Sequence, residues 1–360
     1  MLKSLESVKA LEDQAASALR ALIEQVPAIK LKDIEVEPPG ADRGIDILAR
    51  ILVAGRPRVL VCEVKASGQP RHVRVALLQL RNYLAHFGSE ATPVFIAPYL
   101  SPEAQALCRA QGVGFLDLEG NARLVFDGVF IDRLVPSKPS VERREIKSLF
   151  KPKSAQVLRV MLRDPRRAWR VAELAKAAGV SLGHVSNVRS GLLDREWAHV
   201  SDRGLFLSKP DALLDVWRDA YEPPAGKRGG FYTTLHGSAF EEAARRILHA
   251  GPDKGRAVFA SFSAAHWQAA YVRTGMQYFY ADDVGLERLR TDLKLSSPST
   301  GENVVVTVLK DDGLFHDTVE PTEGVVCTSP VQTYLDLAVA GERGREAAEH
   351  LRQERLRWPT

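Results

Sequence analysis

The sequence predicts a multidomain protein of mixed α/β and α+β class, on three observations. At 360 residues, the chain has room for two or three domains of ordinary size. Its apolar content of 45% and charged content of 26% are typical of globular proteins and argue against wholesale disorder. Strand-like and helix-like patterns alternate over residues 1–137, give way to short helices over 154–220, and resume over 231–360. We expect these three stretches to be domains, joined by a basic linker at 138–153 and a second linker at 221–230.

The first domain is predicted to open with an amphipathic helix, because Leu11, Ala15, Leu19 and Leu22 are spaced by three and four residues. Apolar runs then predict strands at 29–36, 44–53 and 58–66, the last two forming a hairpin across a Gly/Pro turn at 54–57. The remaining elements are a helix at 73–87, a strand at 93–98, a helix that begins after Ser101, and strands at 114–118 and 129–134. This order predicts a mixed sheet covered by helices.

The hairpin carries the residues of greatest chemical interest. Side chains alternate along a strand, so Glu63 and Lys65 share a face at the end of an apolar strand, and Asp46 lies on the partner strand. Two carboxylates that converge from adjacent strands can bind a hard divalent cation. A nearby lysine can hold the water that attacks a phosphorus. The alternative is a surface salt bridge, or a site that binds without catalysis.

Asp46 followed by Glu63-Val64-Lys65 resembles the motif of the PD-(D/E)xK nucleases, which have the restriction-endonuclease fold. The resemblance covers about residues 1–135. It implies that Asp46, Glu63 and the carbonyl of Val64 hold Mg²⁺ or Mn²⁺, and that Lys65 assists the attacking water. Several family members add a Gln or Glu from the following helix, and Gln79 is the matching residue here.

The middle of the chain is basic. Residues 138–195 hold fourteen Lys and Arg against five Asp and Glu, a local net charge of +9 in a chain whose net charge is +4. Such a region indicates a polyanionic partner, most simply DNA, although a solvated basic surface would have the same composition.

Residues 171–197 resemble a winged helix-turn-helix, with a turn glycine at Gly179 and the stretch 198–209 as the hairpin wing. Val185, Val188 and Leu192 are expected to face inward, so the other side of the third helix would enter a major groove. The expected DNA-binding residues on and before this helix are Ser181, His184, Ser186, Asn187, Arg189 and Ser190. We expect Arg163, Arg166, Arg167 and Arg170 to contact phosphates. A winged helix that binds only protein is the alternative.

The tail of the chain carries a second resemblance. The stretch from Ser329 to Leu337, with residues 112–124 and the central helices, resembles the AbiEi antitoxins of type IV toxin–antitoxin systems. The resemblance covers about residues 110–360, with a nuclease-like segment placed in front. It implies a DNA-binding repressor of its own operon, with a cognate toxin as partner.

Two functional hypotheses follow. In the first, the protein is a Mg²⁺-dependent DNA endonuclease targeted by the winged helix. In the second, it is a transcriptional regulator or antitoxin whose nuclease-like domain is not catalytic. DNA is the expected partner in both, with a cognate toxin and a second copy of the chain as further candidates. The three cysteines are too dispersed for a disulfide framework, and no apolar run could span a membrane, so we expect a cytoplasmic protein.

Overall fold

The computed structural model describes residues 2–38, 44–87, 90–136, 138–249, 255–271, 275–297 and 301–358, and side chains from residue 7 onward. The chain divides into two units. The N-terminal unit comprises Met1–Arg143 with Leu193–Glu196, and the C-terminal unit comprises Arg144–Leu192 with Trp197–Thr360. Both contain a mixed sheet and helices, so the predicted α/β, multidomain class is confirmed.

The N-terminal unit is built on a seven-stranded sheet whose strands follow one another in chain order. The first three strands are antiparallel, the third to fifth are parallel, and the last two return antiparallel. Its strands are β1 (Ile29–Val36), β2 (Ile47–Val53), β3 (Arg56–Val64), β4 (Ala91–Ala97), β5 (Gly114–Asp117), β6 (Ala122–Phe126) and β7 (Val129–Arg133). Its helices are α1 (Leu2–Glu24), α2 (Pro70–Phe87) and α3 (Pro102–Ala110).

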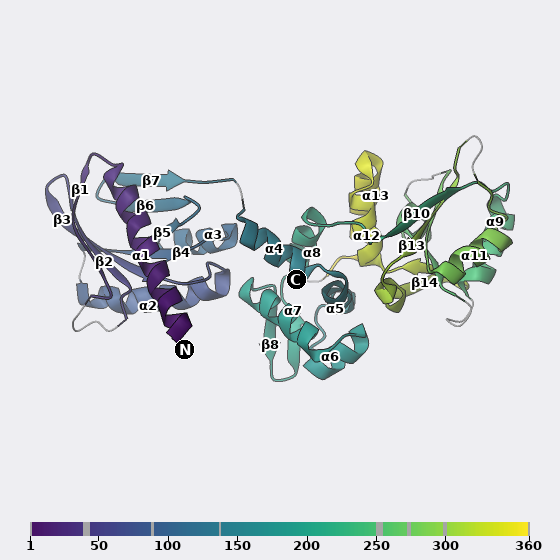
Figure 1. Cartoon of the computed structure of the whole chain (residues 1–360), viewed down its shortest axis with the longest axis horizontal. Helices are drawn as coiled ribbons and strands as arrows, with labels where there is room; N and C mark the ends of the chain where they lie inside the picture. The colour runs from purple at the N-terminus through teal and green to yellow at the C-terminus, as the bar shows by residue number, and fades with distance from the viewer. Residues whose placement is uncertain are drawn as a thin grey trace. The chain divides into compact units, whose positions relative to one another are not determined.

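Two helices cover opposite faces of this sheet (Figure 1). The apolar stripe of α1, which includes Ala15 and Leu19, packs with Leu60 and Cys62 of β3. On the other face, Val61 of β3 packs with residues of α2 and α3. Successive strand residues therefore enter different cores, as the alternation predicted. The strand β6 was not expected from the sequence. Its five residues lie between two turns only a few residues apart, a length at which apolar pattern alone is a weak signal.

In the C-terminal unit, the helical middle contains helices followed by a two-stranded hairpin. We call the group α5 (Pro152–Arg163), α6 (Val171–Ala178), α7 (Leu182–Asp194), β8 (Ala198–Ser201) and β9 (Gly204–Leu207) the helix–hairpin module. Gly179 ends α6 in the left-handed conformation, with φ of 63°, where glycine carries no steric penalty. The basic stretch 138–153 contains a further helix, α4 (Ser140–Leu149), and α8 (Pro210–Asp219) follows the hairpin.

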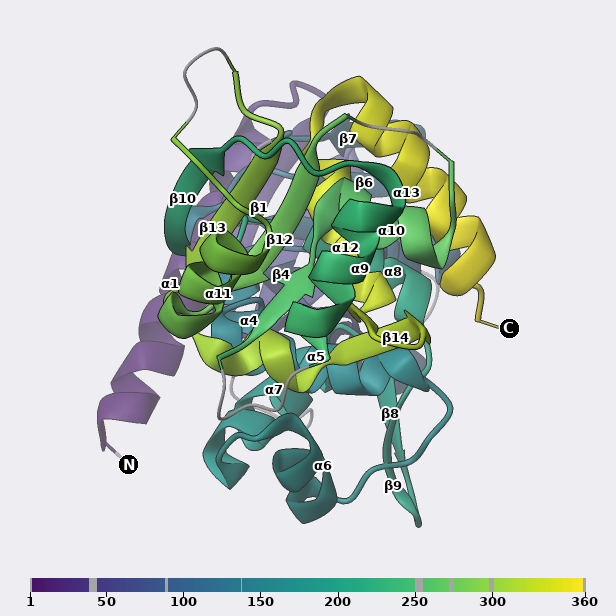
Figure 2. The same ribbon diagram turned by 90° about the vertical axis from the view of Figure 1, so that its right-hand side faces the viewer.

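The rest of the C-terminal unit surrounds a six-stranded sheet of order β10-β13-β12-β11-β15-β14. Helices α9 and α11 cover one face (Figure 2). The strands are β10 (Gly226–Phe231), β11 (Ala257–Phe259), β12 (Gln277–Ala281), β13 (Val304–Leu309), β14 (Thr318–Thr322) and β15 (Val325–Thr328). The helices are α9 (Gly237–Leu248), α10 (Ser261–Gln268), α11 (Asp283–Asp292), the 3₁₀ turn η3 (Asp312–His316), α12 (Pro330–Ala338) and α13 (Gly341–Arg355).

The sheet begins earlier than the sequence predicted. Residues 226–230 were assigned to a linker, but they pair along their length with β13. A Cβ at Gly226 would lie 2.4 Å from the carbonyl oxygen of Val308, so the strand needs glycine there. A glycine-rich strand has no alternating side chains, and so its sequence reads as a linker. None of the helices in the described part of the chain is long and apolar enough to cross a membrane.

Candidate active site and nucleic-acid interface

The pairing of β2 with β3 brings the three motif residues together. Ile47 lies opposite Cys62, which places Asp46 beside the end of β3. The Asp46 carboxylate accepts a hydrogen bond from the backbone N–H of Val64, with a distance of 2.6 Å between Oδ2 and N. The Lys65 ammonium donates to Glu63 Oε1, and the Glu63 side chain is only 1% exposed. The hairpin therefore holds Asp46, Glu63 and Lys65 in one cluster, which we call the carboxylate site.

Helix α2 borders this cluster. The Tyr83 hydroxyl donates to the carbonyl oxygen of Gly44, two residues before Asp46, at 2.6 Å. The charges of Glu63 and Asp46 add to burial in raising the pKa of Tyr83. Gln79 lies one helical turn before Tyr83, and its Oε1 is buried without a hydrogen-bond partner among the described residues.

A third acid, Glu12 of α1, was missed in the sequence analysis. It is 5% exposed, and burial followed by the charge of Asp46 raises its pKa. Its Oε2 has no hydrogen-bond partner within the described structure. One signal was present: Glu12 lies three residues before Ala15 and seven before Leu19, on the buried stripe of the helix, where a charged residue is unusual.

The electrostatics of the carboxylate site are unbalanced. The pKa of Glu63 is raised to about 7. Burial is the main cause, the nearby charges of Asp46 and Glu12 add to it, and Lys65 opposes it. Burial also raises the pKa of Asp46, although the Val64 N–H and Lys65 oppose this. Glu63 Oε2 is buried with no hydrogen-bond partner among the described groups. Three acids thus share one lysine, an arrangement that a bound cation would stabilise.

The donor atoms fit a hard cation. Carboxylate and carbonyl oxygens are the ligands that Mg²⁺ and Mn²⁺ prefer, and Mg²⁺ commonly takes one or two carboxylates and keeps several waters. Within the described residues, no three His, Cys, Asp or Glu side chains form a group able to hold a metal. Asp46 and Glu63 would therefore be the carboxylate ligands, and Glu12 would act from outside the coordination shell.

The third helix of the helix–hairpin module has the two faces that its sequence predicts. Val185, Val188 and Leu192 are buried. The predicted DNA-binding residues on the other face are exposed, except Arg189, which is half-buried. Ser181 accepts a hydrogen bond from the N–H of His184 at 3.4 Å and so caps the helix, and its Oγ lies 2.8 Å from His184 Nδ1.

The four arginines predicted to contact phosphates are all exposed, but their surroundings differ. Arg163 ends α5 and pairs with the buried Asp317. The Arg167 guanidinium lies over the Trp169 ring, 3.7 Å from its centroid. Arg170 is the N-cap residue of α6, and Arg166 lies in the turn at 164–167 that follows α5.

Parts of several solved structures resemble part of the chain. A repair endonuclease from Pyrococcus abyssi is 19% identical, over 28% of this chain and 46% of that chain, with a TM-score of 0.22. The apo form of EndoMS is 19% identical over 29% and 45%, with a TM-score of 0.22. An EndoMS–dsDNA complex is 22% identical over 31% and 46%, with a TM-score of 0.21. The chain thus spans about half the length of each.

No curated protein matched the chain. A family model did match, over residues 206–357, and its description is transcriptional regulator, AbiEi antitoxin, type IV toxin–antitoxin system. The match begins in β9 and extends through α13, so it contains the tail residues Ser329–Leu337 on which the resemblance was based. Over residues 206–357 the chain is therefore similar to the AbiEi antitoxin family of transcriptional regulators, as its sequence predicted.

Proposed function

We propose that the protein is a DNA-binding regulator that also carries a Mg²⁺-dependent nuclease site in its N-terminal unit. The observation that supports the nuclease is the buried Glu63, which has one oxygen on Lys65 and the other without a partner. A salt bridge with only a structural role has no reason to keep two further acids close by. An unsatisfied buried carboxylate oxygen costs stability unless something binds it.

Each residue of the carboxylate site has a proposed task. Asp46, Glu63 and the Val64 carbonyl would hold Mg²⁺ or Mn²⁺, which supplies charge stabilisation at a phosphate oxygen and a more acidic bound water. Lys65, anchored by Glu63, would orient the attacking water toward the phosphorus. Gln79 would place its carboxamide at the edge of the site beside Tyr83. Burial, helped by the charges of Asp46 and Glu12, raises the pKa of Glu63 to about 7, so near neutral pH Glu63 would hold its proton part of the time until a cation binds.

We propose that the helix–hairpin module is a winged helix that delivers DNA to the protein. Asn187 and Arg189 would read base edges. Ser181, His184, Ser186 and Ser190 would contact the backbone with Arg166, Arg167 and Arg170. We leave Arg163 out, because its guanidinium is already engaged by Asp317.

A second function is favoured by the match over residues 206–357. In it, the protein represses its own operon and neutralises a cognate toxin, as a monomer or as two copies, and the carboxylate site is inactive. The two proposals share the winged helix and differ in whether the carboxylate site of the N-terminal unit is catalytic and in whether the protein has a toxin partner.

The nuclease is tested on supercoiled, linear and branched DNA with Mg²⁺ or Mn²⁺. We expect metal-dependent nicking by the wild type, abolished in Asp46→Asn and Glu63→Gln and strongly reduced in Lys65→Met. Glu103→Gln is the matched control, since Glu103 is exposed on α3 and the charge change is the same. Cleavage that persists in Glu63→Gln would assign the activity elsewhere, and no cleavage under any condition would favour the repressor.

DNA binding is tested by fluorescence anisotropy against the upstream region of the protein's own gene and against random duplex. Asn187→Ala or Arg189→Ala should cost about 1–3 kcal/mol on the preferred sequence only. Arg166→Ala and Arg167→Ala should weaken both duplexes alike and reduce the salt dependence. Equal losses from both pairs of variants would show that α7 does not read sequence.

Gly183→Ala separates folding from binding. A Cβ there would meet only Ser181 Oγ at 3.8 Å, so the folded protein has room for it, and alanine favours the helix by up to about 1 kcal/mol. A DNA backbone that packs closely on this turn would not have room. We therefore expect an unchanged or slightly higher melting temperature together with weaker DNA binding.

A further inference from the structure

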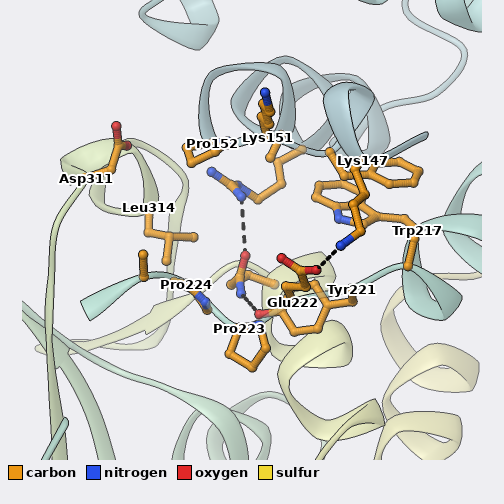
Figure 3. Close-up of a pocket in the computed structure, with 16 residues that line it drawn as sticks. Lys147, Lys151, Pro152, Trp217, Tyr221, Glu222, Pro223, Pro224, Asp311 and Leu314 are labelled. Carbon is orange, nitrogen blue, oxygen red and sulfur yellow. Dashed lines mark hydrogen bonds and ion pairs between the residues drawn. The ribbon is translucent and has the colours of Figure 1, made fainter. Parts of the chain in front are cut away.

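A cavity of about 310 Å³ lies inside the C-terminal unit, remote in sequence from the carboxylate site. Its walls come from the end of α4, the start of α5, the end of α8, the segment 221–225, η3 and α12 (Figure 3). This volume is at the lower end of the range for small-molecule sites, which extends from about 300 to 1,000 Å³. Neither proposed function uses it.

One wall of the cavity is flat and apolar. The rings of Trp217 and Phe150 are stacked, with centroids 5.3 Å apart and planes within 1° of parallel. Pro223, Pro224 and Leu314 add apolar lining elsewhere in the pocket: in Figure 3, Pro223 lies near Tyr221, and Leu314 lies across the pocket from Trp217. Flat apolar surfaces of this kind suit a planar, aromatic body.

A buried cation lies in the polar part of the lining. Arg159 of α5 is only 4% exposed, and burial lowers the pKa of its guanidinium, against the charges of Asp317 and Asp336. Its Nη1 donates to Gln332 Oε1 at 3.3 Å, while its Nε has no hydrogen-bond partner in the described structure. Asp317 lies 3.6 Å from that Nε, but it also pairs with Arg163. Arg159 and Arg163 thus share Asp317, and Asp336 is the further buried acid whose charge acts on Arg159.

At the mouth of the cavity, basic side chains outnumber acidic ones. Lys147 is paired with Glu222 at 2.6 Å, and Asp311 is paired with Lys153 at 3.4 Å. Lys151, exposed at the N-cap of α5, pairs with no acidic side chain among the described residues. An anion that enters the cavity would therefore meet one lysine without an acidic partner among the described residues at the mouth and, within, a buried arginine whose Nε has no hydrogen-bond partner there and whose nearest acids are Asp317 and Asp336.

We propose that this cavity binds a small planar organic anion, of the aromatic carboxylate class. The ring would pack beside Trp217 and the two prolines. The carboxylate would take a charge-assisted hydrogen bond from Arg159 and be attracted by Lys151. Gln332 holds Arg159 in place, and it in turn donates to the Tyr221 hydroxyl at 2.7 Å, so the binding geometry is already organised.

The test uses the full chain and two acids, benzoate and 1-naphthoate, with benzamide and 1-naphthamide as neutral matches, followed by saturation-transfer NMR and calorimetry. We expect 1-naphthoate to bind about ten-fold more tightly than its amide. Lys151→Gln should weaken the acid several-fold and leave the amide unchanged. Ala155→Phe, which fills the cavity from α5, should abolish binding of both.

Lys227→Gln is the control, because Lys227 is exposed on β10 and does not line the cavity. Lys151 is also exposed, so its variant should fold even if Ala155→Phe does not. Equal binding of acid and amide, an acid affinity that Lys151→Gln does not change, or no binding of either acid at 10 mM would each overturn the proposal.

Discussion

Both units of the protein bury an acid, but they surround it differently. Burial raises the pKa of Glu63 in the N-terminal unit to about 7 and that of Asp336 in the C-terminal unit to about 6. Asp336 Oδ1 accepts hydrogen bonds from Tyr221, Tyr280 and Gln332, all of them neutral donors. Glu63 has one bond, from Lys65, and two more acids as neighbours.

The difference supports our proposal that Glu63, and not Asp336, is the functional acid. A carboxyl oxygen that accepts several hydrogen bonds from neutral donors is stabilised without a cation, and its removal takes an acceptor away from those donors. A carboxyl group surrounded by further negative charge is stabilised only when a cation binds, so its removal should be harmless without metal. Burial and a raised pKa are common to both, and the balance of charge distinguishes them.

The largest effect should come from removing Asp336, whose Oδ1 accepts three hydrogen bonds, although its Oδ2, like Glu63 Oε2, has no partner among the described residues. Asp336→Ala would leave the hydroxyls of Tyr221 and Tyr280 without this acceptor and the Gln332 amide with only Tyr221 as its acceptor, at a cost of about 3 kcal/mol or more at pH 5. The measurement is denaturant unfolding followed by tryptophan fluorescence. The five tryptophans all belong to the C-terminal unit: Trp169, Trp197, Trp217, Trp267 and Trp358. A loss of unfolding free energy below about 1 kcal/mol would mean that Asp336 does not stabilise the folded protein more than Glu63 does.

The pH dependence of stability should reflect Asp336. Its folded-state pKa is higher than the ordinary value of 3.8, so the folded protein holds the proton more tightly than the unfolded chain. The resulting stability, roughly 3 kcal/mol, is complete below about pH 4 and is lost as the pH rises through about 6. Relative to Asp336→Asn, the wild type should therefore lose stability between about pH 4 and pH 7. A difference that stays constant across that range would contradict the prediction.

Metal should stabilise only the N-terminal unit. At a Mn²⁺ concentration 100 times its Kd, the wild type should gain about 2.7 kcal/mol, because only the folded carboxylate site binds the ion. Glu63→Gln should gain nothing, and Glu103→Gln should behave as the wild type. Circular dichroism follows the unfolding of both units, whereas tryptophan fluorescence follows only the C-terminal one. If Mn²⁺ raised the unfolding free energy equally by circular dichroism and by tryptophan fluorescence, the metal would bind outside the carboxylate site.

The smallest effect is expected at Glu12. Without metal, Glu12→Gln removes one like charge from the carboxylate site, so stability should rise by up to about 1 kcal/mol. Asp13→Asn, on the exposed neighbour, controls for the change in charge on α1. A loss as large as that from Asp336→Ala would show that Glu12 is a satisfied structural acid.

The sequence predicted the local elements because their signals are short-range. The spacing of Ala15 and Leu19, the turn that joins β2 to β3, and Gly179 after α6 depend only on neighbouring residues. The face shared by Asp46 and Glu63 follows from strand alternation once the hairpin is recognised. Such patterns do not depend on how the rest of the chain is arranged, and the alternation of strand and helix over 1–137 and 231–360 was sufficient for the fold class.

Other features required the tertiary structure. Glu12 belongs with Asp46 only because α1 packs across the sheet, and β10 is a strand only because β13 lies beside its glycines. Arg163 was expected to contact DNA until Asp317, 154 residues later, proved to hold it. The cavity around Arg159 is formed by four separate stretches of the chain: 147–159, 217–225, 311–314 and Gln332. Long-range packing decides each of these, because the free energy of a buried charge depends on which groups surround it, and side-chain spacing along the sequence does not specify those groups.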